Sequence, residues 1–132
     1  MSVDVKREQR SEEEASLHRR GVSAAEGFLE RREHSILATG LQEEGYPFDI
    51  VSRDENGIAF TEVIVSAGGE SFPGGDRSEA KRERLEAGSV RFIAAKPQLF
   101  ADGNVNLRFD EIAMTALNGN RAVLRHATNA FS

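Results

Sequence analysis

Two adjacent segments, residues 46–53 and 58–65, constrain the fold of this 132-residue chain more than any other part. They read "YPFDIVSR" and "IAFTEVIV", and both are rich in the aromatic and β-branched residues that are typical of strands. The stretch between them ends in Asn56-Gly57, and Asn-Gly is the strongest short signal for a β-hairpin. The sequence therefore predicts an antiparallel hairpin in the middle of the chain.

The hairpin has two even-numbered registers. A two-residue loop at Asn56-Gly57 places Asp49 opposite Ile64, with Glu62 as the diagonal neighbour, and a four-residue loop over 54–57 places Asp49 directly opposite Glu62. In both registers the two carboxylates share a face, about 5 to 8 Å apart. Like charges at that separation need water, a proton or a cation. A hard divalent cation is one answer to this repulsion, and a carboxylate that points off the end of the strand into solvent is the other and favoured one.

The rest of the chain predicts helices and strands around this hairpin. Apolar residues at helical spacing, Leu17, Gly21, Ala24, Ala25, Phe28 and Leu29, predict a first helix, and residues 34–41 predict a short strand. Residues 76–96 predict a second helix with Asp76 as its N-cap and Glu79 completing a capping box. Two further strands, 105–114 and 121–129, are predicted to join around Asn118-Gly119.

This order predicts an α/β protein with a central mixed sheet flanked by helices, in the sequence α-β-β-β-α-β-β. We expect residues 1–15 to form a charged arm or a helical extension, and residues 16–132 to form a single domain. The glycine-rich stretch 66–76 lacks the Gly-Lys-Ser/Thr ending of a phosphate-binding loop, so it predicts a mobile connection.

Charge is distributed unevenly along the chain. The net charge is −5, and residues 34–76 carry one basic and eight acidic side chains, whereas residues 77–132 carry nine basic and six acidic ones. Only the C-terminal part could supply the basic face that nucleic-acid binding requires. The chain has no cysteine, no membrane-length apolar run and no signal-peptide pattern, so we expect a cytoplasmic protein without disulfides or thiolate metal sites.

The aromatic and histidine side chains favour structural roles. His18, His34 and His126 show no metal-binding spacing, so the sequence favours structural or surface positions for all three. Tyr46 and Phe48 flank Asp49 and could stack on a nucleobase, but packing on the sheet is the favoured interpretation.

Several segments together resemble one known family. "GVSAAEGFLERREHSILATG", "FDIVSRDENGIAFTEV", "LRFDEIAM" and "HATNAF" occur in an order and spacing similar to those of the YraN family, over nearly the whole chain from about residue 21 to 131. That family comprises small bacterial endonuclease-like proteins related to Holliday-junction resolvases. The resemblance implies a restriction-endonuclease-like fold.

The resemblance also implies a site design. In the family an Asp at the end of the second strand and a Glu on the third hold a divalent metal, Mg²⁺ or Mn²⁺, and a Lys two residues after the Glu orients or activates the attacking water. Asp49 and Glu62 match the carboxylates, whereas Ile64 occupies the Lys position. Pro47 and Val22 stand where the family pattern has Glu, so three polar members of the expected site are missing.

Two side chains could restore the site. Glu26 lies one helical turn after Val22 and could reach a metal, and Lys81 at the start of the second helix could reach the vacated Lys position. The alternative for both is a solvated charge on a helix surface.

Three functional hypotheses follow. The favoured one is a nuclease-fold protein that binds nucleic acid with lost or weakened phosphodiester cleavage. The second is an active, structure-selective endonuclease that uses Asp49 and Glu62 with Glu26 or Lys81 and needs Mg²⁺ or Mn²⁺. The third is a protein-binding domain without nucleic acid. The expected partner under the first two is branched or single-stranded DNA, no membrane partner is expected, and the oligomeric state, a dimer included, is left open.

Overall fold

The computed structural model describes residues 3–67, 75–103, 105–116 and 121–131. Its elements, in chain order, are α1 (Val3–Arg31), β1 (Ser35–Ala38), η1 (Leu41–Glu44), β2 (Ile50–Asp54), β3 (Gly57–Ala67), α2 (Glu79–Ala95), η2 (Pro97–Phe100), β4 (Leu107–Ala116) and β5 (Ala122–Ala127). The order of the α-helices and strands confirms the predicted α/β fold class and agrees with a restriction-endonuclease-like fold.

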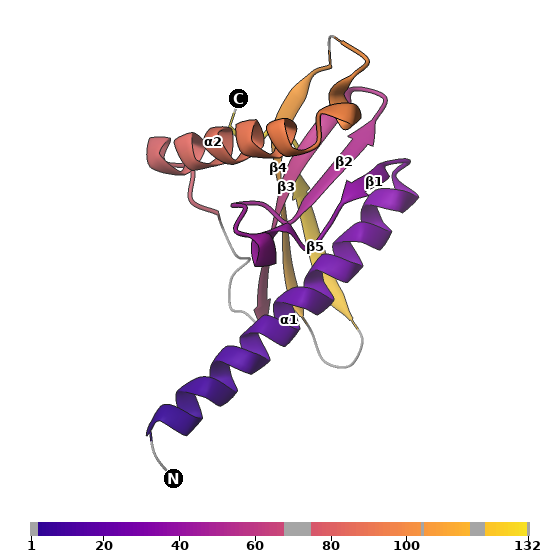
Figure 1. Ribbon diagram of the computed structural model, residues 1–132. Coiled ribbons are helices and arrows are strands. Elements are labelled where there is room, and N and C mark those ends of the chain that lie inside the picture. The colour runs from indigo at the N-terminus through magenta and orange to yellow at the C-terminus, as the bar shows by residue number, and fades with distance from the viewer. Residues whose placement is uncertain (1–2, 68–74, 104, 117–120, 132) are drawn as a thin grey trace.

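The five strands form one mixed sheet in the order β1-β2-β3-β4-β5 (Figure 1). The β3–β4 pair is parallel, and the other three pairs are antiparallel. Two parallel neighbours need a crossover connection, and α2 supplies it. The start of α2 is thereby brought near the carboxyl half of β3.

Each face of the sheet is covered by one helix. Val22, Ala25 and Leu29 of α1 pack with a core cluster that includes Ile50 and Val63. On the other face, Leu85 and Phe92 of α2 pack with Phe48, Val51 and Phe60. Because successive strand residues point to opposite faces, the neighbours Ile50 and Val51 contribute to different clusters.

Helix α1 is longer than the apolar pattern predicts. It begins at Val3 instead of near Leu17, and its N-terminal half projects away from the sheet, where residues 11–15 are exposed (Figure 1). Val22 is buried and Ala24 is exposed, so the buried stripe is rotated slightly from the predicted one.

The hairpin closes one residue earlier than Asn56-Gly57 predicts. Asp54 pairs with Gly57 and Ile50 with Thr61, so the two loop residues are Glu55 and Asn56. The Asp54 carboxylate accepts a hydrogen bond from the Asn56 N–H at 2.9 Å and stabilises this tighter loop. Asp49 directly precedes this ladder, and its N–H donates to the Thr61 carbonyl at 2.8 Å, three residues before Ile64. The pairing of Asp49 with Ile64 is therefore wrong, and the alternative register holds.

The start of α2 also differs from the prediction. Ser78, two residues after Asp76, is the N-cap, and its hydroxyl accepts a hydrogen bond from the Lys81 N–H at 3.1 Å. Asp76 instead accepts a hydrogen bond from the Ser78 N–H at 2.8 Å and supports the cap. The predicted turn at Asn118-Gly119 and most of the glycine-rich stretch lie outside the described residues.

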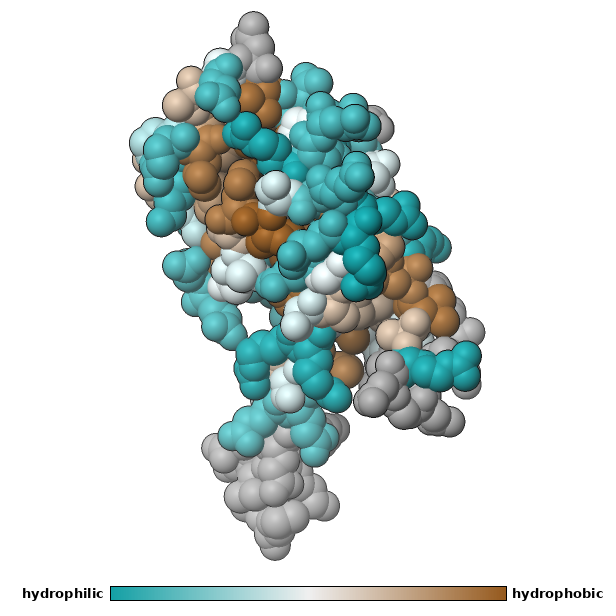
Figure 2. All heavy atoms as spheres, turned by 90° about the vertical axis from the view of Figure 1, so that its right-hand side faces the viewer, coloured by the Kyte–Doolittle hydropathy of each residue, from teal (hydrophilic) through white to brown (hydrophobic). Residues whose placement is uncertain are grey.

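A pocket of about 420 Å³ opens beside β1 and the C-terminal end of α2. Leu37, Leu41, Phe92 and Leu99 are among its lining residues, and Figure 2 looks onto this side, where apolar side chains gather between hydrophilic ones. Over the described part of the chain, no helix combines the length and the apolar character needed to cross a bilayer.

Candidate functional site

Three carboxylates lie on neighbouring strands in the middle of the sheet. The parallel register places Glu62 of β3 beside Glu111 of β4. Asp49, directly before β2, donates its N–H to the Thr61 carbonyl at 2.8 Å, and its carboxylate accepts a hydrogen bond from the Val63 N–H, so it contacts the residues on either side of Glu62. We call Asp49, Glu62 and Glu111 the acid row. Asp49 thus lies next to the strand segment that carries Glu62, and Glu111, which was not predicted, lies beside Glu62 on the neighbouring strand.

Two cationic side chains from the start of α2 reach the acid row. Lys81 Nζ lies 2.7 Å from Glu62 Oε2, and the side chains of Lys81 and Glu62 are only 13% and 19% exposed. Arg77 Nη1 lies 2.5 Å from Glu111 Oε2. This bond raises the pKa of Arg77 and keeps its guanidinium charged. Lys81 therefore points inward to the row and is not a solvated helix charge.

His18 of α1 approaches the row from the opposite face. Its Nε2 lies 2.7 Å from Asp49 Oδ1, while Asp49 Oδ2 accepts a hydrogen bond from the Val63 N–H at 2.7 Å and a longer one from Gln42 at 3.4 Å. Asp49 is 1% exposed, and this burial raises the pKa of its carboxyl, against the opposing effect of the hydrogen bonds from Val63 and His18. Three donors thus hold Asp49 in one orientation.

The sequence analysis gave His18 only a structural or surface role. His18 lies one helical turn before Val22, on nearly the same face of α1. His18 and Glu26 lie one turn before and one turn after Val22, so helical spacing alone relates both to this position. No sequence pattern indicated a place in the site for Glu111 or Arg77. Glu111 reaches the row through the parallel register of β3 and β4, and Arg77 reaches it by pairing with Glu111.

Two of the three apolar departures from the family pattern have packing contacts with a helix. Pro47 lies against α2 at Gly88, where an added Cβ would come within 2.5 Å of the proline Cδ. Val22 belongs to the α1 core cluster, and Ile64 is half-buried in β3 beside Ala113. Pro47 and Val22 therefore pack between a helix and the sheet, and the polar groups near Glu62 come from other positions.

A pocket of about 350 Å³ lies between α1 and the segment from β1 to η1. Arg19, Ser23, Glu26, Thr39, Gln42 and Asp49 contribute to its lining, and we call it the α1 pocket. The Glu26 carboxylate accepts a hydrogen bond from the Thr39 hydroxyl. No group of three or more His, Asp or Glu side chains is placed for a metal ion among the residues that the structure describes. A metal role for Glu26 stays a prediction.

Phe48 is fully buried in an aromatic cluster. Its ring centroid lies 5.0 Å from that of Phe60, 6.3 Å from that of Phe92 and 5.5 Å from that of Tyr46. Phe48 therefore packs on the sheet as predicted and is not available for stacking on a base.

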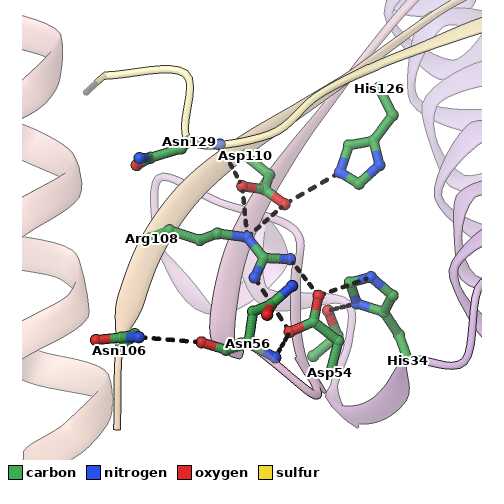
Figure 3. A network of polar contacts seen from close by, with 9 residues as sticks. His34, Asp54, Asn56, Asn106, Arg108, Asp110, His126 and Asn129 are labelled. Atoms are coloured by element: carbon green, nitrogen blue, oxygen red, sulfur yellow. Dashed lines mark hydrogen bonds and ion pairs between the residues drawn. The ribbon is translucent and has the colours of Figure 1, made fainter.

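A second polar cluster surrounds Arg108 on β4 (Figure 3). The guanidinium donates two hydrogen bonds to Asp54, at 3.1 and 2.8 Å, and its Nε lies 3.1 Å from Asp110 Oδ1. Asp110 also contacts His126 Nε2 at 3.0 Å and accepts from the Asn129 N–H at 2.8 Å. The cluster joins β2, β4 and β5.

The same cluster contains a serine, a histidine and an aspartate in contact. His34 Nδ1 lies 2.9 Å from Ser52 Oγ, and His34 Nε2 lies 3.5 Å from Asp54 Oδ2. Ser52 has no exposed surface, so no substrate can reach its hydroxyl. Burial lowers the pKa of His34. The cluster is a structural connection and not a hydrolytic centre.

Comparisons with known proteins identify relatives over most of the chain. No protein-family model matches it. A UPF0102 protein of Geobacter sulfurreducens is 31% identical over 113 residues, which cover 85% of this chain and 85% of that protein. A UPF0102 protein of Geobacter metallireducens is 32% identical over 117 residues, which cover 88% of this chain and 92% of that protein. The chain therefore belongs to the UPF0102 family, which is the YraN family.

Proposed function

We propose that this protein is a metal-dependent endonuclease that hydrolyses phosphodiester bonds of branched or single-stranded DNA at the acid row. The observation that carries the proposal is the contact between Lys81 and Glu62, with Nζ 2.7 Å from Oε2. It supplies, from α2, the cation that the family pattern places at position 64. Buried ionic groups are costly to maintain, and they cluster at functional sites. Burial of Asp49 beside this pair and beside a pocket supports a working site over a remnant.

The residues present fit a hard divalent cation. Mg²⁺ takes oxygen ligands and is commonly held by one or two carboxylates together with water and substrate phosphates, so Asp49 and Glu62 are a sufficient donor set. His18 engages Asp49 Oδ1, so binding of a cation to that oxygen competes with this hydrogen bond. When bound, the cation would neutralise phosphate charge and make a water more acidic.

The protein's own groups would bind and orient the substrate. The Lys81 ammonium, fixed by Glu62, would lie beside a phosphate oxygen and offset the negative charge that grows there during in-line displacement. Arg77 is 40% exposed beside it and offers a second positive charge. The Val63 N–H keeps the Asp49 carboxylate in place, which lowers the entropic cost of orienting the reacting groups.

Basic residues on both helices suit a phosphate backbone that passes over the row. Arg19 and Arg20 are exposed on α1, one and two residues after His18, and Arg82 and Arg84 are exposed near the start of α2. Neutralising phosphates with such side chains releases counterions and makes binding depend on salt concentration.

The test is a cleavage assay with branched, single-stranded and duplex DNA in Mg²⁺ or Mn²⁺. We expect the wild type to cut at least one of the first two substrates. Lys81→Met should lower the rate about a hundredfold or more, because a preorganised charge that faces the phosphate is lost. Lys96→Met is the matched control, since Lys96 is exposed at the other end of the 17-residue α2 and should leave the rate unchanged.

Two outcomes would contradict the proposal. A wild type that cuts none of the substrates in either metal would exclude it. Cleavage that survives Glu62→Ala at the wild-type rate would show that the activity does not belong to the acid row.

A second candidate function is nucleic-acid binding without cleavage. The specific observation in its favour is that both oxygens of Asp49 already accept hydrogen bonds, from His18 and Val63, and that Glu62 is paired with Lys81. Salt-dependent binding of DNA without cleavage in the same assay would support this candidate. Absence of binding at low salt would exclude both candidates.

A further inference from the structure

We propose that the α1 pocket binds one unpaired nucleobase next to the phosphodiester bond that is cut, and that it thereby selects branched or single-stranded substrates. This inference rests on the proposed function, because it places the DNA backbone over the acid row. It adds a recognition site on the other side of Asp49 from Lys81.

The position and size of the pocket suit a single nucleotide unit. Asp49 lines the pocket and also belongs to the acid row, so a base in the pocket would be attached to a sugar beside the reacting phosphate. Its volume of about 350 Å³ is at the small end of the range for small-molecule sites. A base that is paired and stacked in a duplex cannot enter it without being extruded.

The lining favours a base over a phosphate. The carboxylates of Glu26, Glu43 and Asp49 would repel a phosphate group. A carboxylate accepts hydrogen bonds from the N–H groups of a base edge, as in contacts with the cytosine amino group. Glu26 is half-buried and is oriented by the Thr39 hydroxyl, so one acceptor is already fixed in the wall.

Other groups of the pocket complete the recognition of a base. Ser23 and Gln42 add neutral polar side chains that can donate or accept. His18 and Arg19 add flat side chains, and unpaired bases stack on histidine rings and guanidinium planes. The His18 side chain is 30% exposed, so part of its ring is accessible.

Selection of unpaired substrates follows from the cost of extrusion. Taking a base out of a duplex requires unstacking and unpairing, whereas a single-stranded or frayed base is already free. We expect the wild type to bind a splayed-arm DNA about tenfold or more tightly than a fully paired DNA of the same sequence.

The test measures this preference by fluorescence anisotropy without divalent metal, so that it does not depend on cleavage. Ser23→Trp should fill the pocket and reduce the preference to about equal binding of the two DNAs. Ala24→Trp is the matched control, because Ala24 is the exposed neighbour of Ser23 on the same helix and does not line the pocket. The control should keep the wild-type preference. Thermal melting checks that both variants fold.

Glu26→Gln gives a second test that adds no bulk. The change replaces one carboxylate oxygen of the side chain with an amide NH₂ group. Affinity for a single-stranded DNA should fall about tenfold when the edge of the unpaired base offers hydrogen-bond donors. The loss of affinity should be smaller when that edge offers only acceptors. Equal losses for both kinds of base would show that Glu26 does not read the base edge.

The outcomes separate this inference from the proposed function. Cleavage without any preference for binding unpaired DNA would contradict the proposed base-binding role of the α1 pocket. A preference that survives Ser23→Trp would contradict it as well. Neither result would contradict the endonuclease proposal. A preference that Ser23→Trp removes, in a protein that never cleaves, would support the pocket and overturn the endonuclease proposal.

Discussion

At the scale of residues, the cation that pairs with Glu62 comes from a helix and not from the strand that carries Glu62. Ile64 carries no charge, but the Lys81 ammonium enters from α2 and meets Glu62. A lysine side chain has a flexible four-carbon stem, so its charge can reach a given point from more than one backbone position. A hydrogen-bond partner of Asp49 is likewise a helix residue, His18, which lies one turn before Val22.

The carboxylate pair makes a prediction about metal binding. If Asp49 and Glu62 hold a divalent cation in the folded state, millimolar Mn²⁺ should raise the melting temperature of the wild type, because a ligand specific to the native state stabilises it. Asp49→Asn should abolish the increase.

The control for this prediction is Asp102→Asn, which changes a side chain that is 78% exposed and pairs with Arg53, outside the acid row. It should show the wild-type increase. An unchanged increase in Asp49→Asn would mean that Mn²⁺ binds elsewhere.

At the scale of elements, the position of α2 depends on its close approach to Pro47. A Cβ added at Gly88 would lie 2.5 Å from the Pro47 Cδ and 3.3 Å from Phe48 Cε2. Because α2 also carries Lys81, the position in which this helix packs on the sheet determines whether the Lys81 ammonium reaches Glu62.

We therefore predict that Gly88→Ala displaces α2 and destabilises the protein by about 1–3 kcal/mol, as overpacking does. The cleavage rate should also fall, because Lys81 moves with the helix.

The matched variant is Gly27→Ala in α1, where the added Cβ meets only the flexible end of Arg31 at 3.2 Å. Alanine favours a helix, so this change should stabilise the protein by up to about 1 kcal/mol. Chemical denaturation measures the free energy of unfolding of both variants. Equal values for Gly88→Ala and Gly27→Ala would show that the close contact with Pro47 does not fix the position of α2.

The elements were more predictable from the sequence than the contacts between them. Period-two alternation and helical spacing are local, and they predicted the two α-helices and five strands. The hairpin register was wrong in its first form, because the Asp54 side chain closes the loop earlier than Asn-Gly alone indicates. Glu111 and Arg77 could not be assigned, because the pairing of β3 with β4 joins segments that are distant in the sequence. Lys81 could be suggested only from the family resemblance.

At the scale of the whole molecule, the Arg108 cluster connects strands from both halves of the sheet (Figure 3). Arg108 and Asp110 of β4 contact Asp54 of β2 and His126 of β5. The cluster lies at the end of the sheet where the hairpin turns, whereas Glu62 and Glu111 lie near the middle of β3 and β4. The Arg108 cluster therefore ties three strands together, and the acid row forms its own ion pairs with residues at the start of α2.

The cluster gives the stability of the fold a defined pH dependence. The hydrogen bonds from Arg108 lower the pKa of Asp54 from 3.8 to about 2. Because the folded pKa is the lower one, this contribution is complete above about pH 4 and is lost as the pH falls toward 2. This contribution to the free energy of unfolding is about 2 kcal/mol.

Asp54→Asn should be less stable than the wild type at neutral pH by about that amount, and its stability should fall less steeply between pH 4 and 2. Denaturation curves at several pH values measure the free energy of unfolding of both proteins. A constant difference between the variant and the wild type from pH 4 to pH 2 would contradict this prediction.

The central claim is that Lys81 supplies the charge that Ile64 does not. Its most direct test is the cleavage rate of the double variant Ile64→Lys, Lys81→Met, compared with Lys81→Met alone and with the wild type. We predict that Lys81→Met loses cleavage and that a lysine on β3 restores at least about a tenth of the wild-type rate, because the same charge returns to the same phosphate. Full activity in Lys81→Met, or no recovery in a correctly folded double variant, would contradict the claim.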